Sequence, residues 1–195
     1  MKIGIISDIH ENFHNLILAL KKMKEEKVEQ IICLGDLMND GIAKVLSISA
    51  TPVFMVWGNN DGDRVVLTKT SSRAGSNLVS SINTYDFLEY DNRKIFVTHF
   101  QDLAIPMARS GMFDAIFCGH THISQIEQVG KCLIANPGEV SAQRTGTASL
   151  AIYDTTLHEV RLVVLENTVT LKTKMVEEFF EANREKLGFR PGVKL

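Results

Sequence analysis

Short apolar runs recur through the first half of the chain, and segments with helical spacing lie between them. Leu16, Leu20 and Met23 follow Asn12, a plausible helix N-cap, with lysines and glutamates at the intervening positions. Continuous apolar runs are typical of strands buried on both faces, so this series predicts right-handed βαβ units around a parallel sheet. The apolar runs are 3–6, 31–34 and 53–57.

The second half has a different pattern. Runs with strand character lie close together and are separated by turn-type residues such as Asp91-Asn92 and Gly130. This spacing predicts more antiparallel pairing than in the first half, with one helix at 103–112. The polar, glycine-containing segment 71–81 is expected to be a mobile loop near the site. The predicted strands are 85–90, 94–98, 115–118, 123–128, 131–135, 149–153 and 158–165.

The C-terminal part differs from the rest of the chain. A narrow apolar stripe lies among charged residues between Lys172 and Lys186, and Gly188 and Pro191 follow it. This pattern predicts an amphipathic helix, so we divide the chain into a domain at 1–166 and a helical tail at 167–195. The tail packs either on its own domain or at a subunit contact, which leaves a homo-oligomer possible. The stripe is formed by Met175, Val176, Phe179 and Phe180.

Composition narrows the function classes. The chain has 195 residues, 45% of them hydrophobic and 23% charged, which fits one globular domain with a substantial core. A net charge of −2 and the lack of a basic run disfavour binding to duplex nucleic acid. A phosphate-bearing substrate would then have to be attracted by metal ions rather than by the protein surface.

The three cysteines and the first residues bear on location. Cys33, Cys118 and Cys132 lie in apolar runs, so we expect small buried thiols, a reducing compartment and no disulfide framework. Residues 1–7 read as a strand rather than a signal peptide, because the apolar run is short and Asp8 follows it. No stretch reaches the ~20 apolar residues that span a bilayer. We therefore predict a cytoplasmic protein without a membrane partner.

Metal-binding residue types follow five of the predicted strands. They are imidazoles, carboxylates and an amide, a mixture that suits hard to borderline divalent ions such as Mn²⁺, Fe²⁺, Zn²⁺ or Ni²⁺. Seven such residues are too many for one tetrahedral zinc but suit two ions, which typically lie ~3.5–4 Å apart in two-metal sites. The segments are Asp8-Ile9-His10, Gly35-Asp36, Gly58-Asn59-Asn60-Asp61, Thr98-His99 and Gly119-His120-Thr121-His122.

These five segments, in this order, resemble the calcineurin-like metallophosphoesterases. The resemblance runs from Met1 to about Asp154, and the turn Asn136-Pro137-Gly138 together with the Asn59-Asn60-Asp61 spelling favours the small, single-domain phosphodiesterase branch. It implies an α/β fold, specifically a four-layer α/β/β/α sandwich of two mixed sheets with flanking helices. It also implies a hydrolase with a dinuclear metal centre, most simply manganese, acting on a small phosphate ester through a metal-bridging hydroxide.

The resemblance assigns a role to each residue. Asp36 would bridge the two ions and, with Asn59 and Asp61, belong to the catalytic set, and Asn59 would also contact substrate. Asp8, His10 and His122 would complete the shell of the first ion. The second ion would be completed by Asn59, His99 and His120.

Three positions depart from the family pattern. Larger relatives have a histidine directly after the ligand Asn, whereas this chain has Asn60 and Asp61; a deprotonated aspartate beside cations is a poor proton donor, so Asp61 is expected to orient a ligand or a water. Phe100 replaces a more usual glycine and would narrow the pocket or offer a stacking face. Glu139 replaces a small hydroxyl residue, so it either points away from the site or changes specificity.

Two further positions complete the prediction. Arg144 could clamp a phosphate oxygen with its guanidinium fork. His14 lies one helical turn after His10 but is expected to be solvated on the helix surface. The main interpretation is a metal-dependent phosphoesterase, and the resemblance favours diesters over monoesters as substrates. The alternative is a protein-binding scaffold of the same fold with little or no turnover.

Overall fold

The structure, a computed structural model, describes residues 1–170. Its first sheet has the strand order β11-β10-β1-β2-β3-β4, in which β1 to β4 are parallel and β10 and β11 are antiparallel additions. These strands are β1 (Lys2–Ile6), β2 (Gln30–Cys33), β3 (Val53–Met55), β4 (Leu78–Ser80), β10 (Ser149–Asp154) and β11 (Glu159–Val164). The predicted parallel βαβ series of the first half is therefore confirmed.

The second sheet has the order β5-β6-β7-β9-β8. Its central strands β6, β7 and β9 are parallel, and β5 and β8 pair antiparallel at the two edges. The strands are β5 (Tyr85–Tyr90), β6 (Arg93–Phe100), β7 (Ala115–Gly119), β8 (Gln125–Val129) and β9 (Cys132–Asn136). Both sheets are mixed, as the resemblance implied.

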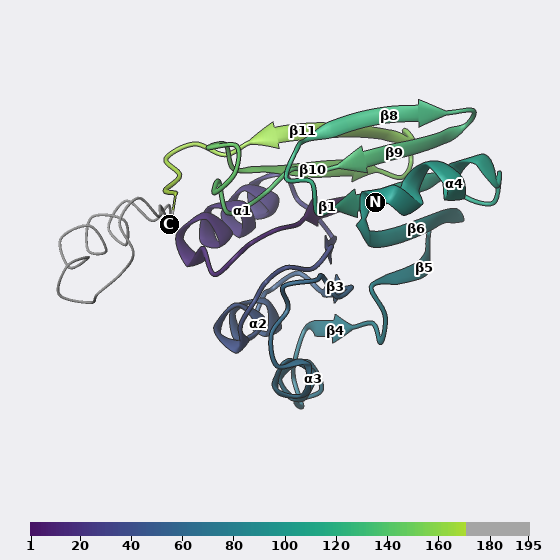
Figure 1. Ribbon diagram of the computed structural model, residues 1–195. Coiled ribbons are helices and arrows are strands. Elements are labelled where there is room, and N and C mark those ends of the chain that lie inside the picture. Colours follow the sequence, from purple (N-terminus) through teal and green to yellow (C-terminus); the bar gives the residue numbers. More distant parts are fainter. Residues whose placement is uncertain (171–195) are drawn as a thin grey trace, which may run out of the picture.

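Helices cover the outer faces of the two sheets and complete the predicted four-layer sandwich (Figure 1). The first sheet carries α1 (Phe13–Glu25), α2 (Asp40–Ser47) and α3 (Arg64–Ser71). The second carries η1 (Gln101–Leu103), a 3₁₀ turn, and α4 (Ala104–Arg109). Three buried apolar clusters fill the three spaces between the four layers.

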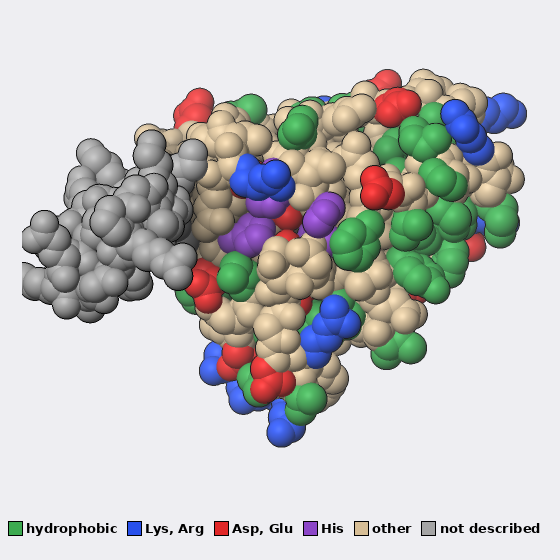
Figure 2. Space-filling model, in the orientation of Figure 1, with side chains coloured by type: hydrophobic (Ala, Val, Ile, Leu, Met, Phe, Trp, Pro, Cys, Tyr) green, Lys and Arg blue, Asp and Glu red, His purple; other side chains and the backbone are tan. Residues whose placement is uncertain are grey.

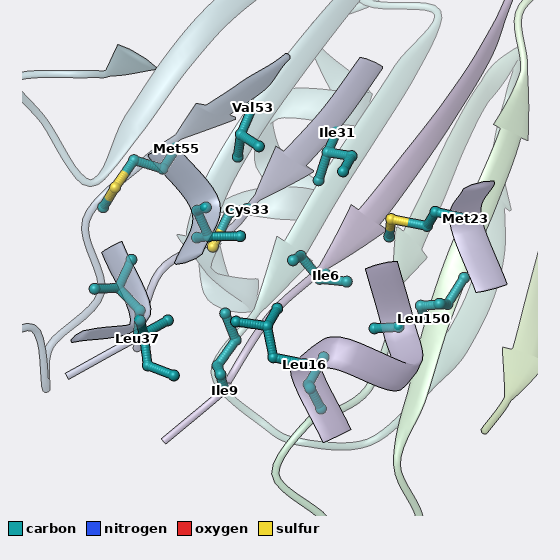
Figure 3. Close-up of a cluster of buried hydrophobic side chains, with 14 of the residues drawn as sticks. Ile6, Ile9, Leu16, Met23, Ile31, Cys33, Leu37, Val53, Met55 and Leu150 are labelled. Atoms are coloured by element: carbon teal, nitrogen blue, oxygen red, sulfur yellow. The ribbon is translucent and has the colours of Figure 1, made fainter. Parts of the chain in front are cut away.

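Strand β2 shows why the runs must be apolar on both sides. Ile31 and Cys33 pack in the cluster beneath the helices, which Figure 3 shows together with Leu16 and Met23 of α1. The alternate residue Ile32 packs in the cluster between the sheets. A strand with two buried faces has no solvent-facing positions, so its sequence shows an unbroken apolar run.

The segment 71–81, predicted to be a loop, is a loop over residues 72–77, but its first residue ends a helix and residues 78–80 form a strand. Residues 64–71 form α3, with Asp63 as the N-cap, and 78–80 form β4 beside β3. Both elements are short and each buries only one apolar side chain, so their apolar periodicity is weak. Leu67 of α3 and Leu78 of β4 are fully buried and hold this segment to the core.

The described chain ends beside the start of α1. The backbone of Val169 exchanges hydrogen bonds with Asn15, and the Asn12 side chain donates to the Val169 carbonyl at 2.8 Å. The predicted amphipathic helix, between Lys172 and Lys186, lies outside the described residues. Among residues 1–170, no helix has the length and apolar character needed to cross a bilayer. Cys33, Cys118 and Cys132 are buried free thiols, as expected.

Candidate metal centre

The two sheets end at a common edge, and the seven predicted ligands lie there. In the first sheet they follow the parallel strands β1, β2 and β3, and in the second they lie at the ends of β6 and β7. Figure 2 shows histidines gathered at one place on the surface with acidic side chains between them. The residues are Asp8, His10, Asp36, Asn59, His99, His120 and His122.

Five of these seven residues have left-handed backbone conformations, which L-residues seldom adopt. A left-handed residue turns the chain sharply at the strand end and aims the side chain back across the sheet edge. Such conformations cost about 1–3 kcal/mol each and persist where the surrounding structure imposes them. The φ angles are 53° at Asp8, 44° at His10, 55° at Asp36, 71° at His120 and 65° at His122.

Two glycines allow the loops to meet. A Cβ atom on Gly58 would collide with the backbone nitrogen and carboxylate of Asp36, and one on Gly119 would collide with the hydroxyl of Ser7. Any other residue at these positions would force apart the strand ends that carry the ligands. Glycine in these two motifs therefore permits a close approach of backbones.

The first group of ligand atoms is formed by Asp8, His10 and His122, with Asp36 next to it. Asp8 Oδ1 lies 3.3 Å from His122 Nε2 and 3.7 Å from His10 Nε2, and His10 Nε2 lies 3.5 Å from Asp36 Oδ2. Two ligands of one divalent ion, at bond lengths of about 2.1 Å, are separated by roughly 3–3.5 Å. The spacing fits a shared cation.

The second group is formed by Asp36, Asn59, His99 and His120. His99 Nε2 lies 2.9 Å from Asn59 Oδ1, 3.2 Å from His120 Nδ1 and 3.6 Å from Asp36 Oδ2. The other nitrogen of His99 contacts the Leu34 carbonyl at 2.7 Å, which leaves Nε2 with its lone pair toward the site. Asp36 Oδ2 thus borders both groups.

Two buried ligand atoms lack a hydrogen-bond partner, although the polar groups around them are close. Asp8 Oδ1 and His10 Nε2 are both fully shielded from solvent and accept or donate no hydrogen bond among the described residues. An unsatisfied buried polar atom is costly, and a coordinated cation removes that cost for a carboxylate and an imidazole together. The residues present therefore fit a divalent metal ion.

Electrostatics link the same two residues. Burial by itself would raise the pKa of Asp8, but the neighbouring imidazoles, His10 foremost, outweigh it and lower that pKa. Burial would lower the pKa of His10, but Asp8 and Asp36 outweigh it and raise that pKa. The site attracts positive charge, as a cation site must.

Asp61 does not face the ligand atoms. Its two oxygens accept four backbone N–H groups, from Asp36 at 3.2 Å, Leu37 at 2.8 Å, Met38 at 3.2 Å and Gly58 at 2.7 Å. The carboxylate therefore ties the loop after β2 to the loop after β3, and all its hydrogen bonds go to these backbone groups.

Glu139 is fully buried behind His122 rather than exposed to the site. His122 Nδ1 lies 2.7 Å from Glu139 Oε2, and the same carboxylate accepts hydrogen bonds from the loop that follows it. Burial would raise the pKa of Glu139, but the bonds from His122, Ser141 and Thr145 outweigh it and hold that pKa well below its usual range. Of the two expectations for Glu139, the structure favours the one in which it points away.

Phe100 and Arg144 lie at the margin of the centre. The Phe100 ring is half-buried, with its centroid 5.1 Å from those of both His99 and His120. Arg144 is exposed, and its backbone N–H donates to Glu139. His14 is exposed on α1 and contacts the Asn167 carbonyl at 2.9 Å, so it does not join the ligands.

Sequence reasoning gave no binding role to Asn60. Its backbone N–H and side-chain amide each donate to the Asp36 carboxylate at 2.8 Å, which fixes the orientation of that group. The sequence feature that could have indicated this role is the position of Asn60 directly after the predicted ligand Asn59, in a tight turn. The role of Glu139 carried a clearer signal, because an acid beside a predicted metal site must be neutralised by donors.

Comparisons with known proteins agree with this geometry. Residues 1–157 match the family model of the calcineurin-like phosphoesterase superfamily domain. The chain is 33% identical to phosphodiesterase MJ0936 of Methanocaldococcus jannaschii over 168 residues, which cover 85% of this chain and 100% of that protein. It is 25% identical to phosphodiesterase YfcE of Escherichia coli over 173 residues, with 79% and 88% covered.

Solved structures give the same picture. The structure of an archaeal phosphodiesterase superposes with a TM-score of 0.75 at 32% identity, covering 85% of this chain and all of that one. A Vps29 structure from Entamoeba histolytica, with a TM-score of 0.60, 17% identity and 85% and 100% covered, shares the fold alone. From the match over residues 1–157 and the 33% identity, the chain belongs to the calcineurin-like phosphoesterase superfamily.

Proposed function

We propose that this protein is a dinuclear metal-dependent phosphodiesterase that hydrolyses a small phosphate ester. The observation that carries the proposal is the position of Asp36 Oδ2, within 3.6 Å of a histidine nitrogen in each of the two ligand groups. A carboxylate in that position can serve two ions at once. The names of MJ0936 and YfcE support a diester rather than a monoester as substrate.

The chain's own residues prepare the site. Asn60 holds the Asp36 carboxylate, and the Leu34 carbonyl orients His99, so the ligand atoms are in place before a cation arrives. Two divalent ions bound there would lower the pKa of water and offset the negative charge that develops on a phosphoryl group. Because water activated in this way would be the nucleophile, no serine or cysteine of the chain is needed to attack the phosphorus atom.

The direction of substrate approach follows from burial. Asp8, His10 and His122 of the first group are buried, whereas Asn59 and His120 of the second are exposed. We infer that the ester enters on the side of the second group. Phe100 would limit the width of that entrance, and the exposed Arg144 would contact a phosphate oxygen with its guanidinium group.

The natural ions are proposed from ligand chemistry. Imidazole, carboxylate and amide ligands suit Mn²⁺ first, with Ni²⁺, Fe²⁺ or Zn²⁺ as alternatives. Three buried free thiols support a reducing compartment, consistent with a cytoplasmic enzyme. A homo-oligomer is compatible with this function, and a duplex nucleic acid or a membrane is not an expected partner.

The proposal is tested by measuring metal content and hydrolysis on metal-free protein and on protein reconstituted with Mn²⁺ or Ni²⁺. We expect about two ions per chain and metal-dependent hydrolysis of bis(4-nitrophenyl) phosphate that exceeds hydrolysis of 4-nitrophenyl phosphate. A protein that binds two ions but hydrolyses neither ester would instead support the scaffold alternative. A protein that binds no ion would refute the site.

A further inference from the structure

Glu139 stands out among the buried groups that the proposed chemistry does not use. Its side chain has 0% relative exposure, yet it carries a carboxylate within hydrogen-bond distance of an imidazole assigned to a metal. A buried carboxylate must be compensated by donors, and those present come from two different places, the His122 ring and the loop at 141–145. The group therefore connects a ligand to a loop.

The contact with His122 determines how that ring presents itself. Both oxygens of an ionised Glu139 can only accept, so the hydrogen bond at 2.7 Å requires a proton on His122 Nδ1. The lone pair of the neutral ring then lies on Nε2, which faces Asp8 Oδ1 at 3.3 Å. Two acceptors facing each other at that distance need a cation between them. A carboxylate on the far nitrogen also makes an imidazole a stronger ligand.

The other contacts fold the loop around the same carboxylate. Oε1 accepts the backbone N–H of Arg144 at 2.9 Å and both the N–H and the hydroxyl of Thr145, at 2.7 Å and 2.8 Å. Oε2 accepts the Ser141 hydroxyl at 2.5 Å and the Gln143 N–H at 3.0 Å. The loop thus closes on the carboxylate as on a bound anion, with Ala142 in a left-handed conformation.

The same segment also braces the carboxylate ligand opposite His122. The Ser141 N–H donates to the Asp8 carbonyl at 3.0 Å, and the Val140 N–H donates to the Ser7 carbonyl at 3.0 Å. Displacing the Glu139 loop would therefore disturb Asp8 and His122 together. By contrast, His99 is oriented by a backbone carbonyl, so no side-chain substitution removes its support.

We propose that Glu139 is the positioning residue of the first metal position: it fixes the His122 tautomer, and it fixes the loop that carries Arg144. This inference rests on the proposed function, because it assigns Glu139 to the same centre. It predicts that loss of the Glu139 carboxylate directly changes the metal affinity of the first position and the nitrogen of His122 that carries the proton. The effect on turnover follows from these two changes.

The decisive substitution is Glu139→Gln, which keeps the shape but places an NH₂ group among donors. The NH₂ group will take the orientation in which it faces the fewest other N–H donors, and that orientation points it toward His122. His122 Nδ1 can accept this N–H only if the ring proton moves to Nε2, the metal-facing nitrogen. We expect the affinity for Mn²⁺ at one of two positions to fall about 10–100-fold, the range for partners of metal ligands. Glu127→Gln, an exposed acid on β8, is the matched control and should leave both affinities unchanged.

Titration calorimetry with Mn²⁺ and ¹⁵N NMR of the histidine rings, with His122 assigned through His122→Ala, test the proposal. In the wild type we expect a proton on His122 Nδ1 in the Zn²⁺-loaded protein. A proton on Nε2 instead would overturn the proposal without any variant, as would wild-type affinities in folded Glu139→Gln. Wild-type protein that shows the Nδ1 proton and binds metal but lacks esterase activity would refute the proposed function and leave this inference standing.

Discussion

The loops after β1, β2 and β3 bring both carboxylates, the amide and one imidazole to the centre, whereas β6 and β7 of the second sheet bring three imidazoles. Each half is backed by one further buried carboxylate. Asp61 behind the first half binds only backbone N–H groups, and Glu139 behind the second binds both backbone and a ligand ring. Charged ligands therefore need support for their loops, while a neutral imidazole also needs its tautomer fixed.

The strongest test of this division is Asp36→Asn, which removes the carboxylate charge whose Oδ2 lies near a histidine of each ligand group. We expect loss of metal from both positions and a fall in diesterase rate of at least about 10³-fold, since the metals supply the nucleophile. Metal content measured by mass spectrometry, with circular dichroism to check the fold, would decide. Retention of two ions by the variant would show that Asp36 does not bridge.

Asp61→Ala should affect stability most. It strips the acceptors from four backbone N–H groups in the loops after β2 and β3, and we expect a loss of about 3 kcal/mol in the free energy of unfolding. Urea denaturation measures it. Asp63→Ala is the matched control, because Asp63 only caps α3, and its loss should cost about 1 kcal/mol.

Asp61→Asn distinguishes loop support from proton donation. If Asp61 supports the loops, aryl and alkyl diesters should be hydrolysed with a steep dependence on leaving-group acidity in both the wild type and the variant, because general acid help worth about 10²–10⁴-fold is lacking in both. Rates across a series of leaving groups test this. A flat wild-type dependence that becomes steep in Asp61→Asn would identify Asp61 as the acid.

A buried thiol in each sheet should lower the free energy of unfolding at high pH by a similar amount. Burial raises the pKa of Cys33 in β2 and of Cys118 in β7 to about 12. A raised pKa in the folded state means that stability is complete below the unfolded value of about 8.5 and declines as the pH rises toward 12. We expect each thiol to cost about 2 kcal/mol at pH 10, so Cys33→Ala and Cys118→Ala should narrow the difference in unfolding free energy between pH 7 and pH 10. An unchanged difference would mean that these thiols reach solvent.

His14→Ala should have the smallest effect. His14 lies one turn from His10 on α1, but it is exposed and contacts only the Asn167 carbonyl among the residues described. Metal affinity and rate should stay within about twofold of wild type, and stability within about 0.5 kcal/mol. Loss of metal from this variant would mean that the ligand set of the first half is wrong.

The sequence predicts the fold, and the meeting of the five motif segments at one edge of the sheets, because both depend on local patterns. Ile31 and Cys33 belong to an unbroken apolar run that only a doubly buried strand requires, and Gly35-Asp36 follows that run at once. Helix α3 and strand β4 escaped prediction because Leu67 and Leu78 are the only buried apolar residues among residues 64–80, and two buried positions give no period.

The roles of the two supporting carboxylates, Asp61 and Glu139, could not be predicted from local sequence patterns. Asp61 accepts from backbone groups about 25 positions earlier, and Glu139 from a ring 17 positions earlier. Carboxylates look alike in sequence whether they face a metal, a backbone loop or a histidine. Only the folded arrangement separates Asp36, Asp61 and Glu139 into these three roles.

The left-handed backbone at five of the seven ligand positions has an evolutionary consequence. Glycine adopts that conformation without penalty, so a ligand-to-glycine change at such a position removes strain as it removes function. His120→Gly should therefore leave a protein about 1 kcal/mol more stable than His120→Ala. A lineage released from selection for catalysis would be expected to lose this centre early while keeping the sandwich, because folding alone favours the loss.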